Sequence, residues 1–294
     1  MSLPPETTPP GGDRVVLTLS CPDQRGIVHR VTGILASLDC NITESQQFGD
    51  RYTKRFFMRV AAVSEGRADV LDLLREAVAD LAIELGGEWE VHDPDVRERV
   101  LVLVSKEGHC LNDLLYRWRS GLLPIDLVGV ASNHPDLREL SEANGVPFHH
   151  FPVTPTTRAD QEARILDVVR RERVELVVLA RYMQILSNDL CVALDGRAIN
   201  IHHSFLPSFK GARPYHQAHE RGVKLIGATA HFVTADLDEG PIIEQEVSRV
   251  DHTDGPEQLV AIGRDLEERA LARAVQWHSE HRILRNGDRT VVFS

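Results

Sequence analysis

In the first third of the chain, some apolar residues form short strand-like runs and others recur at helical spacing. Residues 15–19 are a run of valine, leucine and threonine, which is typical of a strand. Between residues 27 and 38 apolar side chains return at helical spacing, which indicates a helix with one buried face. Continued in this way, the pattern predicts six elements, over residues 15–19, 27–38, 41–45, 54–63, 68–81 and 88–92. Their order, strand-helix-strand-strand-helix-strand, is that of the ferredoxin-like βαββαβ unit.

After residue 99 the pattern changes to alternating strands and helices. Residues 100–104 are apolar at every position, which indicates a parallel strand covered on both faces. Further strands are predicted over residues 126–131, 148–151 and 176–179, and helices over residues 111–118, 135–143 and 159–172. Strands joined by helices at this spacing predict right-handed crossovers and a Rossmann-like doubly wound sheet. A long helix over residues 256–280 and a hairpin with an Asn-Gly turn follow.

The two patterns indicate that the chain is an α/β protein with two domains. Residues 1–12, rich in proline and threonine, indicate a disordered tail. We assign residues 13–92 to the ferredoxin-like domain, the charged residues 93–99 to a linker, and residues 100–294 to the doubly wound domain.

Composition narrows the class of protein. The chain has 294 residues, 42% hydrophobic and 26% charged, which is ordinary for a globular protein that builds its own core. The net charge of -11 argues against nucleic-acid and anionic-membrane partners, because both need a basic surface. The four cysteines contain no CxxC pair, and neither a signal peptide nor an apolar run of about 20 residues is present. We therefore expect a cytoplasmic protein with free thiols.

Polar residues gather where a buried strand beginning at residue 198 runs into a loop rich in proline and glycine. Side chains alternate along a strand, so Asn200 and His202 face the same side. An amide and an imidazole that converge on one point can stabilise the oxyanion of a tetrahedral acyl intermediate. These two residues are therefore candidate catalytic groups.

A second polar cluster follows a strand that carries His231. The acidic turn after that strand contains Asp238, which we expect to pair with His202. A carboxylate beside an imidazole favours the protonated ring and can also hold a water molecule. The two clusters together supply what formyl transfer or formyl hydrolysis needs, namely oxyanion donors and a group that manages protons.

A metal site is an alternative use of the same side chains. His202, His203, His231 and Asp238 are ligand types that zinc accepts, yet no HxH or HExxH spacing is present. Because adjacent residues diverge on a strand, we expect His203 to point away from His202 and to support the loop. His231 is expected either to hold a neighbouring site residue or to fill the strand.

Other classes of protein compete with an acyl-transfer enzyme. A nicotinamide enzyme needs GxGxxG after the first parallel strand, and residues 105–111 lack it. A nonenzymatic amino-acid sensor needs no oxyanion donors, so the polar clusters disfavour it. Cys110 beside His109 is a candidate nucleophile, although most cysteines are small core residues.

The two polar clusters resemble the folate-dependent formyltransferase family. The matching strings are Asn-x-His followed by Ser-x-Leu-Pro, from residue 200, and His-x-Val-x-x-x-Leu-Asp-x-Gly-Pro-Ile-Ile, from residue 231. In that family the asparagine, the histidine and the final aspartate are catalytic, which implies these roles for Asn200, His202 and Asp238. The resemblance also implies that the folate pocket is walled by Met183, Ile185, Leu186, Thr234, Asp236 and Leu237.

The first domain resembles an ACT domain through its βαββαβ order and its Asp-x-x-Gly turn. Such domains bind an amino acid near the turn and a dimer interface, which implies that Asp23 and Gly26 are effector candidates and that the protein is a homo-oligomer. A dimerisation domain without a ligand remains an alternative, because the fold hosts many functions.

Within the formyltransferase family, three features resemble the formyltetrahydrofolate deformylase branch: the ACT-like domain, His203, and the string over residues 210–224. The resemblance implies hydrolysis of 10-formyltetrahydrofolate by water, in one-carbon metabolism and purine biosynthesis, without cofactor or metal. The loop over residues 105–109 has one glycine and an acid, so it suits the phosphate of a nucleotide acceptor poorly. Formyl transfer to an amine acceptor remains the alternative function.

Overall fold

The computed structural model describes residues 12–65, 69–154, 156–204, 206 and 214–294. Of the predicted tail over residues 1–12, only Gly12 lies within these ranges, and residues 210–213 of the deformylase-like string lie outside them. The chain forms two compact units. The first contains residues up to 96 with residues 280–286 and 291–294, and the second contains residues 97–279 and 287–290.

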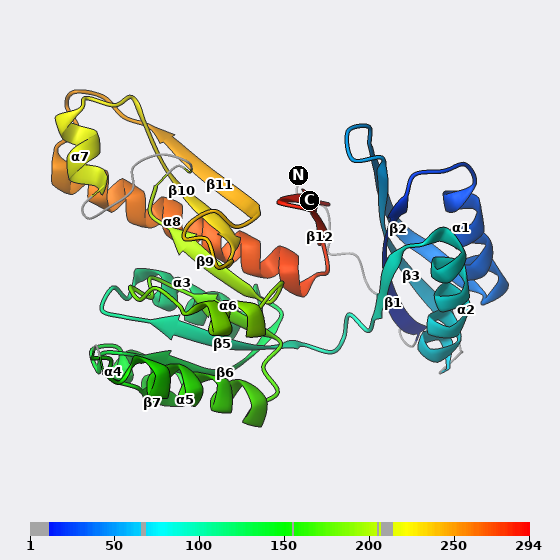
Figure 1. Ribbon diagram of the computed structural model, residues 1–294, viewed down its shortest axis with the longest axis horizontal. Coiled ribbons are helices and arrows are strands. Elements are labelled where there is room, and N and C mark those ends of the chain that lie inside the picture. The colour runs from blue at the N-terminus through cyan, green and yellow to red at the C-terminus, as the bar shows by residue number, and fades with distance from the viewer. Residues whose placement is uncertain (1–11, 66–68, 155, 205, 207–213) are drawn as a thin grey trace, which may run out of the picture. The chain divides into compact units, whose positions relative to one another are not determined.

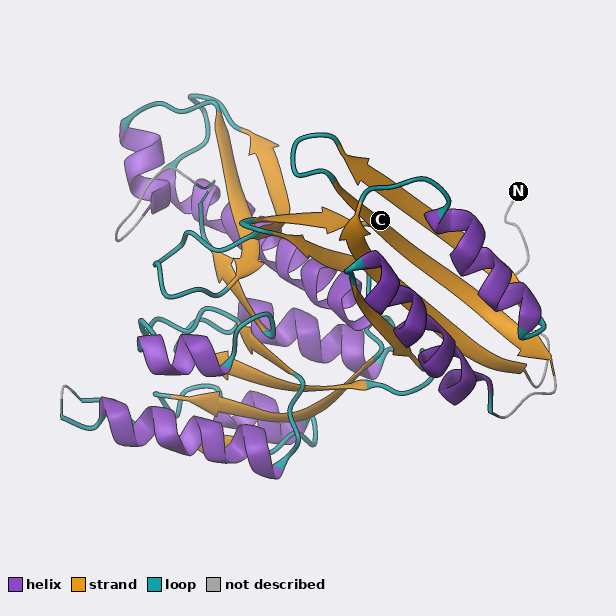
Figure 2. Ribbon diagram, turned by 45° about the vertical axis from the view of Figure 1, so that its right-hand side comes forward, coloured by secondary structure: helices purple, strands orange, loops and turns teal. Residues whose placement is uncertain are grey.

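The first unit is an antiparallel sheet of four strands with two helices packed on it (Figures 1 and 2). The strands lie in the order β2-β3-β1-β4. The elements are β1 (Gly12–Pro22), α1 (Ile27–Ser37), β2 (Cys40–Asp50), β3 (Arg55–Glu65), α2 (Val70–Leu85) and β4 (Glu88–His92). The predicted βαββαβ order is confirmed. Strands β1, β2 and β3 are longer than predicted, whereas β4 has the predicted bounds.

The core of the first unit lies between its sheet and its two helices. The apolar face of α1 buries Val31 and Leu35, and that of α2 buries Leu74 and Val78. These side chains pack with Leu17 and other inward-facing residues of β1. The apolar faces of the two helices thus pack on the apolar face of the sheet and form one core.

The chain ends in a two-stranded hairpin, β12 (Ile283–Asn286) and β13 (Arg289–Val292). The sequence predicted this hairpin correctly but assigned it to the second domain, whereas residues 280–286 and 291–294 belong to the first unit. The physical reason is apolar burial, because Leu284 and Phe293 pack with Phe57 of β3. Arg59 of β3, 4% exposed, also donates hydrogen bonds to the carbonyl oxygens of residues 280 and 281.

The second unit contains a sheet of seven strands in the order β11-β10-β9-β8-β5-β6-β7. Its strands are β5 (Glu98–Val104), β6 (Ile125–Ser132), β7 (Phe148–His150), β8 (Leu176–Leu179), β9 (Ala198–His202), β10 (Leu225–Phe232) and β11 (Ile242–Arg249). Strands β5 to β9 are parallel, as the sequence predicted. The sheet is nevertheless mixed, because β10 runs antiparallel to β9 and β11 antiparallel to β10.

Helices pack on this sheet and bury the apolar strands. They are α3 (His109–Arg119), α4 (Arg138–Ala143), α5 (Arg158–Arg171), α6 (Asn188–Ala193), α7 (Pro214–Glu220) and α8 (Pro256–Ser279). Side chains of α5 and α6 share one core with β5 and β8. The long helix α8 packs on β9, β10 and β11 and against α3 and α7 (Figure 1).

The sequence analysis did not predict α6, α7 or β11. No helix in the described ranges combines the length and the apolar character that a membrane crossing requires.

Candidate active site

A cavity of about 260 Å³ lies in the second unit, where the parallel strands β8 and β9 end. The carboxyl ends of parallel strands are where open α/β sheets place their ligands. Three segments contribute most of the wall: the loop after β8, the end of β9, and the loop after β10. The lining residues are 179, 181–186, 191, 200–203, 231 and 233–238.

His202 and Asp238 form an ion pair inside this cavity. The Nδ1 atom of His202 lies 3.2 Å from Oδ1 of Asp238, and both side chains are largely buried. The hydrogen bond from His202 is the main reason why the pKa of Asp238 lies below its usual value, so the carboxylate is ionised at neutral pH. The backbone at Asp238 is left-handed, with φ of 59°. Aspartate tolerates this conformation better than most residues, which suits it to the tight turn after β10.

The other ring nitrogen of His202 is buried and has no hydrogen-bond partner among the described residues. A buried polar atom without a partner costs stability and is therefore rare outside functional sites. With Nδ1 bound to a carboxylate, Nε2 is the atom that meets a ligand in the cavity. His202 thus lines the cavity, and the expectation that it faces a reacting group stays a prediction.

Asn200 is held by His231. The amide nitrogen of Asn200 lies 3.2 Å from Nε2 of His231, and Nδ1 of His231 lies 2.8 Å from the carbonyl oxygen of Phe232. A carbonyl only accepts, so Nδ1 of His231 carries the hydrogen and Nε2 accepts from the amide. Burial is the main cause that lowers the pKa of His231, which keeps the ring neutral as this arrangement requires. His231 therefore orients the Asn200 amide.

Gly240 holds the loop after β10 close to the end of that strand. A Cβ atom at this position would lie 1.8 Å from the carbonyl oxygen of Phe232 and 3.3 Å from Nδ1 of His231. Only glycine permits such a close approach of two backbone segments. The turn that carries Asp238 thus returns to His202 because residue 240 has no side chain.

The residues expected to wall a folate pocket all line the cavity: Met183, Ile185, Leu186, Thr234, Asp236 and Leu237. Met183, Ile185 and Leu237 are each more than half exposed and line the same cavity, so together they offer an apolar surface to a ligand. The backbone nitrogen of Met183 donates to Oγ of Ser105, which anchors this loop to the end of β5.

His203 lies beside His202, and the expectation that it points away is wrong. The two rings stack with centroids 5.1 Å apart and planes 13° apart. Strand β9 ends at His202, so the alternation that separates neighbouring side chains no longer applies at the next residue. A guanidinium N–H of Arg181 contacts Nδ1 of His203.

The effector candidates lie apart from these residues in the chain, in the first unit. Gly26 is the N-cap residue of α1, and Asp23 donates its backbone N–H to the carbonyl oxygen of Lys54. They occupy the turn between β1 and α1, as the sequence predicted.

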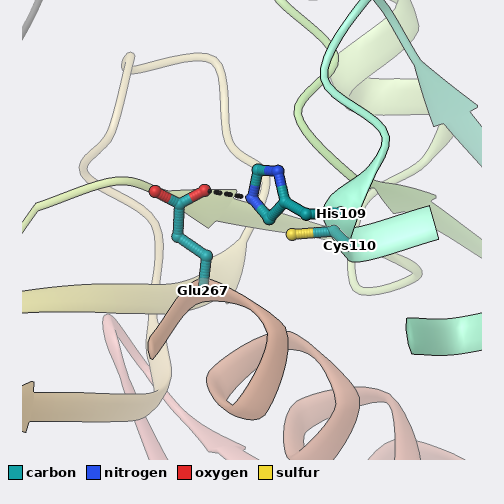
Figure 3. A group of neighbouring side chains, drawn as sticks. All are labelled: His109, Cys110 and Glu267. Carbon is teal, nitrogen blue, oxygen red and sulfur yellow. Dashed lines mark hydrogen bonds and ion pairs between the residues drawn. The ribbon is translucent and has the colours of Figure 1, made fainter. Parts of the chain in front are cut away.

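A second cluster of chemically active side chains lies near α8. Figure 3 shows His109, Cys110 and Glu267, whose ligand-type atoms all lie within 4.8 Å of one another. Burial raises the pKa of the Cys110 thiol well above its usual value, which disfavours both a metal-bound thiolate and a nucleophile. Both carboxylate oxygens of Glu267 already have donors, from His109 and from Tyr215.

The metal alternative drawn from the sequence used His202, His203, His231 and Asp238. In the structure, both ring nitrogens of His231 have hydrogen-bond partners, and Nδ1 of His203 faces Arg181. A cation bound by these nitrogen atoms would have to break the hydrogen bonds that they make.

Arg181, Tyr215 and Glu267 are residues around the site to which the sequence analysis gave no role. A signal for Glu267 existed, because it occupies the apolar face of α8 between Leu266 and Ala270. A carboxylate at a helical position that packs on a sheet is buried only when it is paired. The partners come from distant parts of the chain, so spacing alone did not identify them.

Comparisons with known proteins match both parts of the chain. Residues 98–275 match the family described as formyl transferase, and residues 15–80 match the ACT domain. A formyltetrahydrofolate deformylase of Corynebacterium sp. (strain P-1) is 53% identical, over 95% of this chain and 98% of the relative. A formyltetrahydrofolate deformylase of Bacillus subtilis (strain 168) is 46% identical, over 96% and 94%. The crystal structure of formyltetrahydrofolate deformylase from Burkholderia mallei ATCC 23344 has 54% identity and a TM-score of 0.91, covering 96% of this chain and all of that one.

Proposed function

The chain belongs to the formyltetrahydrofolate deformylases within the formyl transferase family, and from this we propose that it hydrolyses 10-formyltetrahydrofolate to tetrahydrofolate and formate. One observation carries the proposal beyond the similarity. The amide of Asn200 and the unpartnered Nε2 of His202 both line one cavity, with Asp238 behind the histidine. That is the arrangement of donors that a tetrahedral acyl intermediate needs.

In the proposed reaction the formyl oxygen lies against Asn200 and His202. Water attacks the formyl carbon, and the carbonyl π electrons move to the oxygen. The resulting oxyanion accepts hydrogen bonds from the Asn200 amide and from Nε2–H of the His202 imidazolium. The carbon–nitrogen bond then breaks, and its electron pair goes to the folate nitrogen, which takes one proton of the attacking water. The second proton of the water is released to solvent, and formate leaves.

Asp238 has two tasks in this scheme. Its carboxylate stabilises the positive charge on the protonated His202 ring through the 3.2 Å contact at Nδ1. Its second oxygen helps to hold and orient the attacking water. The lowered pKa of Asp238, caused first by the hydrogen bond from His202, keeps the carboxylate charged for both tasks.

Water, rather than an amine, is proposed as the acceptor because the loop after β5 suits a nucleotide phosphate poorly. Glu107 of this loop forms an ion pair with Arg264 at 2.9 Å, and its carboxylate lies where a phosphate would bind. Formyl transfer to an amine acceptor, the alternative from the sequence, is not favoured, because the relatives are named formyltetrahydrofolate deformylases.

The folate ring system is proposed to lie on Met183, Ile185, Leu186 and Leu237, with Thr234 and Asp236 at its polar edge. The scheme uses no metal and no cofactor, since the protons and the oxyanion are handled by side chains. We place the enzyme in the cytoplasm, where the reducing environment suits the four free cysteines, in one-carbon metabolism and purine biosynthesis.

The ACT domain supports a proposal about regulation. An amino acid is proposed to bind at the turn that contains Asp23 and Gly26 and to alter turnover in the second unit. A homo-oligomer assembled through the ACT domains is the proposed form of the enzyme. Equilibrium dialysis with the free amino acids, together with sedimentation of the full chain, tests both statements.

The experiment that tests the main proposal measures formate release from 10-formyltetrahydrofolate without an amine acceptor and with a chelator present. Rapid release by the purified chain, abolished in Asp238→Asn, is expected. Release that starts only when an amine is added would replace hydrolysis with formyl transfer. Loss of release on chelation alone would require a metal in the scheme.

A further inference from the structure

A buried ionic network connects α8 with the histidine pair in the cavity. Glu267 is 1% exposed and lies at its centre. His109 donates from Nε2 to Oε2 of Glu267 at 2.8 Å (Figure 3). The hydroxyl of Tyr215 donates to Oε1 of Glu267, also at 2.8 Å. The Nε atom of Arg181 lies 3.4 Å from Oε2. Each oxygen of this carboxylate thus faces at least one hydrogen donor.

The charge state of Glu267 follows from these contacts. Burial alone would raise its pKa, but the hydrogen bond from His109 and the charge of Arg181 hold the pKa below its usual value. The carboxylate is therefore ionised and balances the guanidinium of Arg181 in a buried place. An ion pair of this kind fixes both partners, since separating them would leave a buried charge alone.

The ring of Tyr215 packs against α8 at Gly263, where there is no side chain. A Cβ atom at Gly263 would lie 2.1 Å from Cζ of Tyr215 and 2.3 Å from its hydroxyl oxygen. Gly263 and Glu267 are one helical turn apart, so the ring lies over the first and its hydroxyl reaches the second. Burial raises the pKa of Tyr215, so the hydroxyl keeps its proton and donates.

Arg181 extends the network to the cavity. Its backbone is left-handed, with φ of 64°, which is uncommon for a residue other than glycine. One end of the guanidinium faces Glu267, and the Nη1 group contacts Nδ1 of His203. Arginine has no acceptor and keeps its charge at all ordinary pH values, so Nδ1 of His203 has to be the acceptor. The hydrogen of the His203 ring is then on Nε2, and the ring is neutral.

A neutral His203 matters because its ring stacks on His202, with 5.1 Å between centroids. Two adjacent imidazolium rings would repel each other, so a proton on His203 would disfavour the proton that His202 needs. The charged or titratable groups that act on His203 include Arg181, His202 and Asp238. On His202, Nδ1 has the carboxylate of Asp238 at 3.2 Å, which favours a proton on that ring.

We propose that Arg181, clamped by Glu267, is a positioning residue that keeps His203 neutral with its hydrogen on Nε2, so that His202 alone of the stacked pair carries the catalytic proton. This inference rests on the proposed hydrolysis for the role of the proton, whereas the tautomer of His203 is a property of the resting protein. The two are measured separately.

The test begins with nitrogen NMR of the full chain carrying ¹⁵N-labelled histidine. His203→Asn identifies the His203 signals by their loss. In the wild type, Nδ1 of His203 should have the shift of an unprotonated acceptor and Nε2 that of an N–H. A proton on Nδ1 of His203 in the wild type at neutral pH would overturn the proposal without any variant or any turnover measurement.

Two variants test the clamp. Glu267→Gln removes the charge that holds Arg181, and Arg181→Met removes the donor to His203. Each should mix the tautomers of His203 and lower kcat about 10- to 100-fold, the usual effect of losing a partner that orients a site residue. Because Glu267 does not line the cavity, its variant should leave KM nearly unchanged. Wild-type His203 shifts and wild-type kcat in both variants, or a change confined to KM, would overturn the proposal.

Arg264→Gln is the matched control. It removes an arginine of α8 that pairs with Glu107 at the surface, and it should change neither the His203 signals nor kcat. If the wild type releases no formate, the proposed function fails, and the NMR result still decides the tautomer. If the wild type is active and the tautomer differs from the one stated, only the positioning role of Arg181 fails.

Discussion

Nε2 of His231 lies 3.2 Å from the amide nitrogen of Asn200 and leaves that amide one hydrogen for the cavity. Because Nδ1 of His231 is committed to the carbonyl oxygen of Phe232, neither the tautomer of the ring nor the orientation of the amide is free to change. The oxyanion donor of the proposed reaction is thus set in place before the substrate binds. Preorganised donors of this kind need no rearrangement when charge develops.

Replacement of Asn200 by alanine should therefore slow the chemical step. Loss of one oxyanion donor is expected to lower kcat by about 100- to 1,000-fold, with a smaller effect on KM. Steady-state formate release measures both constants. Asn200→Asp, which keeps the size but loses the donor, should behave similarly. Near-normal turnover in both variants would remove Asn200 from the mechanism.

The neutral state of His231 predicts a pH dependence. Its pKa lies below the usual value of about 6.5, mainly because the ring is buried. As the pH falls through the lowered pKa, Nε2 gains a proton and can no longer accept from Asn200, so kcat should fall. For stability the sign is the same, because the unfolded state takes up the proton first as the pH falls. A ¹⁵N NMR titration should give a midpoint for His231 below 6.5, and a midpoint above that value would contradict the assignment.

Gly240 predicts a specific failure on substitution by alanine. The new Cβ atom would overlap the carbonyl oxygen of Phe232, at 1.8 Å, so the loop that carries Asp238 has to shift. Overpacking of this kind is expected to cost about 1–3 kcal/mol of unfolding free energy, and the displaced carboxylate should lower kcat. Urea unfolding and formate release measure the two effects.

The matched control for Gly240→Ala is Gly33→Ala in α1. A Cβ atom at Gly33 meets nothing within 4 Å, and alanine favours helix. This variant should be as stable as the wild type or more stable by about 0.5–1 kcal/mol, with unchanged kcat. Equal behaviour of the two variants would show that the close approach at residue 240 has no consequence.

The terminal hairpin should contribute to the stability of the first unit. Leu284→Ala leaves a gap beside Phe57 and Phe293 and is expected to cost about 2–5 kcal/mol. Hydrogen exchange should show the loss in β3 and in the hairpin before other strands. Tyr52→Ala, at a side chain that is 90% exposed, should change stability by less than about 0.5 kcal/mol. Unchanged exchange in β3 of the Leu284 variant would contradict the packing.

Local periodicity predicted most of the fold and the main polar cluster. Alternation along a buried strand correctly placed Asn200 and His202 on one side, because both residues lie within β9. The same rule failed for His203, which follows the last residue of the strand. The loop and its tertiary contacts decide where a strand ends. For a residue just beyond that end, strand alternation no longer predicts the direction of the side chain.

Long-range partners account for what the sequence could not predict. Glu267, Arg181 and His109 are more than 70 residues apart from one another and meet only in the folded unit. The hairpin was recognised from its Asn-Gly turn, but its packing partner Phe57 lies about 230 residues earlier in the chain. The residues of a turn identify a hairpin but do not predict which hydrophobic core the hairpin packs on.

That packing imposes an order of events during synthesis. The strands and helices of the first unit emerge from the ribosome early, yet Leu284 and Phe293, which pack with Phe57, are made only after nearly all of the second unit. Domains normally fold as they emerge, from the N-terminus onward. Here the face of β3 that bears Phe57 stays open to solvent for the time that about 180 residues take to be translated, and the nascent chain needs protection there until its last strands arrive.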